Sequence, residues 1–105
     1  MIAFLMQWDE KERGWGLRPD GWSLHASPAE YEDYLARYWA SVPQPLPDEY
    51  SYPTYDFRLR EIELPDQHAL SRRLAAKGEV RLLQFSDDAK ELERLIGARQ
   101  GRLPD

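Results

Sequence analysis

The chain opens with an apolar, β-compatible run from Met1 to Trp8, which predicts a first strand. The polar residues from Asp9 to Gly14 predict a turn after it, and a second strand is expected to begin near Trp15. The stretch from Arg18 to Gly21 suits a type I turn, because proline fixes φ at its second position. Two strand pairings stay open: residues 15–18 with residues 22–25, or residues 1–8 with residues 15–18.

A capping box at residues 27–30 predicts the start of a helix. Its sequence is Ser-Pro-Ala-Glu, with proline at the first helical position, where the missing N–H costs nothing. Apolar and aromatic residues then recur three or four positions apart, and charged residues occupy the other side. The pattern predicts an amphipathic helix from Pro28 to Ser41, with a stripe formed by Tyr31, Tyr34, Leu35, Tyr38, Trp39 and Val42.

The segment from Pro43 to Pro53 contains four prolines, which argue against regular structure. Because tyrosines accompany these prolines, we expect an ordered loop that packs on the protein. Alternating apolar residues then predict a strand from Phe57 to Leu64, with a phase slip near Arg60.

Two helices and one strand are expected in the remainder. Asp66 is the predicted cap of a helix that ends at Gly78. A β-rich run from Val80 to Phe85 follows, and a third helix begins at Ser86 or Asp87 and ends at Gly97. The expected order is ββαβαβα.

This order predicts an α+β fold, in which a mainly antiparallel sheet of about four strands packs three helices on one face. A split βαβ arrangement is an option for part of it. The length of 105 residues suits one core, so we expect a single domain over residues 1–97. Residues 98–105 are predicted to form a flexible tail.

Composition narrows the class of protein. The net charge of -5 argues against direct nucleic-acid binding, which depends on cations that neutralise phosphates. The chain has no cysteine, which excludes disulfides and thiolate chemistry and fits a reducing compartment, so we expect a cytoplasmic location. The apolar start is too short for a signal-peptide core, and no stretch reaches the roughly 20 apolar residues that span a bilayer. We therefore expect no membrane partner.

Twelve of the thirteen aromatic residues lie between Phe4 and Phe57, so function is expected in the first half of the chain. Trp, Tyr and Arg are the residue types enriched at interface hot spots, although core packing is the better explanation for any single Trp in a small domain. We predict binding of a protein or protein complex, with a homodimer as an alternative use of the same surface. The predicted contacts are Trp15, Arg18, Asp20, Trp22, His25, Tyr38, Tyr50 and Tyr52.

A small anionic ligand is the second hypothesis. Arg18 lies between Trp15 and Trp22 in the sequence, and Arg beside aromatic rings can hold a nucleotide-like molecule. Arg72 and Arg73 can form a local anion site on the second helix, although a solvated helix face explains them better.

Catalysis has the weakest support. Ser23, His25 and Asp20 supply the residue types of a nucleophile, base and orienting group, but no nucleophile motif accompanies them. His25 and His68 lie in different elements, so no metal site or cofactor is predicted. The leading hypothesis is a non-catalytic inhibitor or adaptor. By analogy alone, it could be a mobile-element inhibitor that blocks a nucleic-acid-handling complex in host defence.

Overall fold

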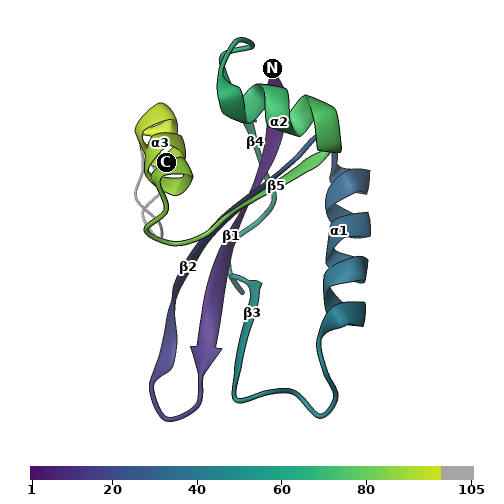
Figure 1. Ribbon diagram of the computed structural model, residues 1–105, viewed down its shortest axis with the longest axis vertical. Helices are drawn as coiled ribbons and strands as arrows, with labels where there is room; N and C mark the ends of the chain where they lie inside the picture. Colours follow the sequence, from purple (N-terminus) through teal and green to yellow (C-terminus); the bar gives the residue numbers. More distant parts are fainter. Residues whose placement is uncertain (98–105) are drawn as a thin grey trace.

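The computed structural model describes residues 1–97, which form one curled antiparallel sheet with helices around it (Figure 1). The predicted α+β class is confirmed, with five strands where about four were expected. The predicted flexible tail, residues 98–105, lies outside the described residues. The elements are β1 (Ile2–Glu12), β2 (Gly16–His25), α1 (Pro28–Ser41), β3 (Glu49–Pro53), β4 (Arg60–Glu63), α2 (Ala69–Lys77), β5 (Glu79–Leu82) and α3 (Asp87–Ile96).

Strands β1 and β2 form one long hairpin, in which residues 4–7 pair with residues 22–25 and residues 9–12 pair with residues 16–19. Both predicted pairings are therefore wrong in register. The polar residues of β1 continue the strand to Glu12, so the turn lies at residues 13–15. Partners Gln7 with Trp22 and Asp9 with Pro19 show a shift in register. The predicted turn at residues 18–21 is therefore wrong, because its Pro-Asp-Gly residues lie within β2 and form a β-bulge instead.

Gly21 allows β5 to approach this bulge. Its φ is +87°, and a Cβ at this position would lie 1.9 Å from the carbonyl oxygen of Leu82. Its N–H donates to Oε1 of Gln84 at 3.2 Å. Only glycine combines this dihedral with such a close backbone contact.

Strands β3 and β4 share the free edge of β1. Residues 2–5 of β1 pair with β4, and residues 8–12 pair with β3. The prediction that residues 43–53 lack regular structure is wrong for β3, because it is an edge strand that tolerates Pro53 at its end. The extra strand changes the expected order to ββαββαβα.

The predicted bounds of α1 are confirmed. Oγ of Ser27 accepts a hydrogen bond from the backbone N–H of Glu30 at 3.1 Å, as the capping box requires. The cap of α2 is His68 and not Asp66: its Nδ1 accepts from the N–H of Leu70 at 3.0 Å. Asp66 instead bonds to the amino group of Met1.

Helices cover both faces of the sheet, which corrects the expectation of one covered face. In Figure 1, α1 lies on one side of the strands and α3 on the other, with α2 across one end. One core contains Trp22 with α2 and α3, and its buried residues include Leu5, Leu24, Leu70, Leu74, Leu82 and Leu92. The other core places Met6 and Trp8 against Tyr31 of α1.

Within residues 1–97, no helix combines the length and apolar character needed to cross a membrane.

We expect Gly21→Ala to lower the free energy of unfolding by at least about 3 kcal/mol, because its Cβ would displace the backbone of β5. Gly14→Ala is the matched control. Its φ is +86°, but no atom lies within 4 Å of the added Cβ, so the cost should be about 1 kcal/mol. Urea unfolding of both variants checks this, and equal losses would contradict the importance of the close approach.

Candidate functional site

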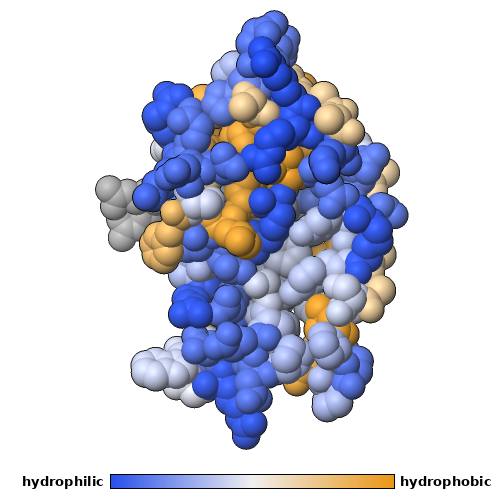
Figure 2. Space-filling model, in the orientation of Figure 1, coloured by the Kyte–Doolittle hydropathy of each residue, from blue (hydrophilic) through white to orange (hydrophobic). Residues whose placement is uncertain are grey.

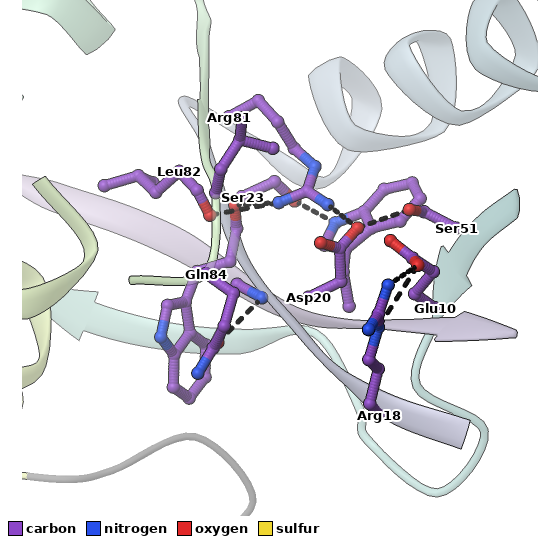
Figure 3. A network of polar contacts seen from close by, with 12 residues as sticks. Glu10, Arg18, Asp20, Ser23, Ser51, Arg81, Leu82 and Gln84 are labelled. Atoms are coloured by element: carbon purple, nitrogen blue, oxygen red, sulfur yellow. Dashed lines mark hydrogen bonds and ion pairs between the residues drawn. The ribbon is translucent and has the colours of Figure 1, made fainter. Parts of the chain in front are cut away.

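A polar network lies where β1, β2, β3 and β5 meet beneath α1 (Figure 3). At its centre, Oδ2 of Asp20 accepts from Nη2 of Arg81 at 2.9 Å and also from the hydroxyl of Ser51. The carbonyl of Ser51 in turn accepts from the hydroxyl of Tyr38. The network thus ties the bulge of β2 to β5, β3 and α1.

Arg81 closes the end of the β2–β5 ladder. Its Nη1 donates to the carbonyl oxygens of Trp22 and Leu82, at 3.1 and 3.0 Å. Its Cζ lies 4.9 Å from the centre of the Trp8 ring, a cation–π distance. Burial lowers the pKa of the guanidinium, although Asp20 acts in the opposite direction. Arg81 therefore serves the fold and offers few donors to a ligand.

A second chain of hydrogen bonds runs along the same face of the sheet. Nε1 of Trp8 donates to Oγ of Ser23 at 2.8 Å, and this Oγ lies 2.7 Å from Nε2 of His25. The geometry fits a Ser23 hydroxyl that accepts from Trp8 and donates to a neutral imidazole. Among the described residues, Nδ1 of His25 has no hydrogen-bond partner. The ring packs against Tyr31 and Tyr34, with centroids 5.0 and 5.2 Å away.

The structure brings Ser23 and His25 together, but not as a hydrolytic site. Both side chains are buried, so a substrate has no access to the hydroxyl. Asp20 bonds to Arg81 and Ser51 and does not orient His25. The buried Ser23 hydroxyl and His25 imidazole therefore hydrogen-bond to one another within the core.

The outer part of the β1–β2 hairpin carries an exposed aromatic side chain and an exposed apolar one. Trp15, in the turn, exposes 83% of its surface, and Leu17 exposes 62%. Figure 1 shows this turn projecting at the end of the molecule farthest from α2. Figure 2 shows mostly blue and white over that end, because Trp and Tyr are near neutral in hydropathy, with an orange group between β3 and α1.

A groove separates the β1–β2 turn from the proline-rich loop before β3. Leu46, Pro47 and Tyr50 lie on one side, and Gly14 and Gly16 on the other. The N–H of Arg13 donates to the carbonyl of Asp48 at 3.0 Å, and their side chains form an ion pair at 3.3 Å. We call this surface the hairpin end: Arg13 to Leu17, Leu46 to Asp48, and Tyr50.

Three carboxylates border the hairpin end. Glu10, Glu12 and Glu49 can each place an oxygen within 4.8 Å of the others, an arrangement that could hold a cation. Arg18 already bonds to two of them, with its Nη2 2.5 Å from Oε1 of Glu10 and 3.1 Å from Oε2 of Glu12. The hydrogen bond and negative charge of Glu12 raise the pKa of the Glu49 carboxyl. The cluster therefore retains excess negative charge. The guanidinium of Arg18 supplies the positive charge that a metal ion would otherwise supply.

The predicted contact residues divide between surface and core. Trp15 and Arg18 are exposed, and Tyr50 and Tyr52 are half-buried on β3. Tyr38 is half-buried between α1 and β3, where its ring packs against Trp8. These placements keep four of the predicted residues near one end of the sheet: Trp15, Arg18, Tyr50 and Tyr52.

Trp22 and His25 are corrections to the predicted binding set. Both are 0% exposed, because β2 enters the core beyond the bulge and is covered on its two faces. Asp20 is mostly buried in the network with Arg81. None of the three presents a side chain to a partner in this structure.

Arg72 and Arg73 do not form a joint anion site. Nη2 of Arg72 donates to Oε1 of Gln67 at 3.2 Å, whereas Arg73 pairs with Asp88 of α3 at 2.5 Å. The two guanidinium groups have different partners because adjacent residues on a helix point in different directions.

Sequence reasoning missed several residues that matter here. Leu17 and Leu46 add apolar surface at the hairpin end, but exposure of an isolated Leu has no local sequence signal. Arg81 and Ser51 were not expected beside Asp20, since all three lie on separate strands. A charged residue inside the β-rich run 80–85 was the one available hint.

Comparisons with known proteins give no relative: no family model, curated protein or solved structure matches the chain.

We expect Asp20→Ala to lower the free energy of unfolding by about 2–3 kcal/mol, because Arg81 loses its carboxylate while withdrawn from water. Arg73→Ala is the control. It breaks an exposed ion pair with Asp88 and should cost less than about 1 kcal/mol. Chemical denaturation measures both, and a loss for Asp20→Ala no larger than the control's would show that the network adds little stability.

We expect acid to destabilise the protein through His25. Burial, and then the positive charge of Arg37, lower its pKa from 6.5 to about 4. The unfolded chain therefore binds this proton more readily than the folded protein does. The contribution of His25 to the free energy of unfolding is complete above pH 6.5 and declines as the pH falls toward 4, by about 3 kcal/mol. In His25→Gln the difference in unfolding free energy between pH 7 and pH 4 should shrink by that amount. An unchanged pH dependence would refute the assignment.

Proposed function

We propose that the protein acts by binding another protein through the hairpin end, as an inhibitor or adaptor and not as a catalyst. The observation that carries the proposal is Trp15, a large side chain 83% exposed on a projecting turn. An exposed Trp with apolar neighbours marks an interaction site more strongly than a single apolar residue does, and Trp is among the residues most enriched at interface hot spots.

Neighbouring residues extend this apolar contact. Leu17 and Leu46 expose 62% and 46% of their surfaces, and Tyr50 packs its ring 6.3 Å from Trp39 of α1. The ladder between β1 and β2 holds the turn, and the bonds from Arg13 to Asp48 hold the loop against it. A surface held in this way loses little conformational entropy when a partner binds.

The charge of this end favours a protein partner over an anionic one. Glu10, Glu12 and Glu49 gather beside it, and Arg18 is already engaged by two of these carboxylates. This negative charge would repel a nucleotide or a phosphate backbone. It would attract a basic protein surface, such as that of a nucleic-acid-handling complex. The absence of cysteine fits a reducing compartment, and the proposal includes a cytoplasmic location.

We expect Trp15→Ala to reduce capture of the partner by at least about tenfold, since truncation removes the central apolar contact. The unfolding free energy should change by less than about 0.5 kcal/mol because the side chain is exposed. The experiment is affinity capture by the intact chain from lysate of its source organism, with mass spectrometry of the retained proteins.

Phe85→Ala is the matched control for this experiment. Phe85 exposes 80% of its surface on the connection between β5 and α3, away from the hairpin end. Its variant should capture the partner as the parent does. Equal capture by Trp15→Ala, or loss only in Phe85→Ala, would place the interface elsewhere and end the proposal.

A further inference from the structure

We propose that the groove of the hairpin end receives a segment of the partner protein in which an apolar side chain lies next to Arg or Lys. This inference rests on the proposed function and specifies the chemistry of the partner. The apolar side chain occupies the groove, and the basic one meets the carboxylates at its border.

The groove has the size and lining for one large side chain. Its volume is about 400 Å³. Leu46, Pro47 and Tyr50 supply an apolar wall, and at Gly14 and Gly16 no atom lies within 4 Å of an added Cβ. The rest of the lining is charged: Lys11, Glu12, Arg13 and Asp48. An apolar side chain that enters the groove is removed from water and contacts the side chains of the apolar wall.

A second hollow adjoins the groove across Gly16. Glu12 and Gly16 line both hollows, and Trp15 and Arg18 line the second. Trp15 therefore lies next to the groove, where it can contact a bound segment. The groove and the adjoining hollow together place apolar and charged side chains close enough for one short peptide to contact both.

The border of the groove carries one negative charge in excess. Glu10, Glu12 and Glu49 lie beside two cations, the guanidinium of Arg18 and the ammonium group of Lys11, which also lines the groove. Asp48 is paired with Arg13, so this pair adds no net charge. The raised pKa of the Glu49 carboxyl has the same cause, since it lies against Glu12. A cationic side chain from a partner would relieve this repulsion, whereas an acidic one would add to it.

The test uses random dodecapeptides displayed on phage and selected on the immobilised full chain. Retained peptides should pair an aromatic or aliphatic residue with a neighbouring Arg or Lys. One selected peptide is then synthesised and its affinity measured by calorimetry for the parent chain, Leu46→Ser and Glu49→Lys. We expect each variant to weaken binding by about tenfold or more, and added salt to weaken binding to the parent.

Glu61→Lys is the control for charge reversal, because Glu61 is an exposed carboxylate on β4, outside the groove. Its affinity for the peptide should match that of the parent. The inference is overturned if selection yields no binder or acidic binders, or if Glu49→Lys binds as tightly as Glu61→Lys. Concentration-dependent dimerisation in sedimentation that Leu46→Ser abolishes would also overturn it, since a second copy would then fill the groove.

The same variants separate this inference from the proposed function. If capture of the partner from lysate is lost in Trp15→Ala but unchanged in Leu46→Ser and Glu49→Lys, the hairpin end is an interface and the groove is not part of it. If all three variants capture the partner normally, both proposals fail.

Discussion

The half-buried ion pair between Asp20 and Arg81 is the interaction on which the geometry of the sheet depends. It lies where β2 bulges and β5 ends, and the guanidinium completes its hydrogen bonds on the carbonyls of Trp22 and Leu82. Charge withdrawn from water is tolerated only when it is paired and its donors are satisfied. The ring of Trp8 and the close approach at Gly21 leave little freedom for another register.

The bulge divides one long hairpin into two parts with different roles. On the inner side, β2 pairs with both β1 and β5, and helices cover the two faces. On the outer side, residues 16–19 of β2 pair with β1 alone, and the turn projects. Trp22 therefore supports the core, while Trp15, seven positions earlier, presents an unburied ring to solvent. The packed inner part holds the projecting outer part in place, which is the arrangement that the proposed recognition surface requires.

Local signals predicted the helices better than the strands. The capping box at Ser27 predicted the first residue of α1 correctly. Asp66 was the expected cap of α2, but His68 caps this helix, and Asp66 instead accepts a hydrogen bond from the amino group of Met1, which is distant in sequence. The Pro-Asp-Gly sequence was interpreted as a turn because its residues suit both a turn and a bulge. The choice between them depends on the backbone of Leu82, which local sequence does not contain.

By itself, the sequence determined the α+β class, the bounds of α1, the glycine ends of the other two helices, and the concentration of aromatic residues in the first half. These features depend on hydrogen bonds and periodicity within a few residues. Only the tertiary structure decided which aromatic residues are buried, and that Asp20 meets Arg81 across 61 positions. Burial is a property of contacts between distant segments. Trp15 and Trp22 are the same residue type in similar local sequence. Their burial therefore differs only because β5 and the helices pack against Trp22.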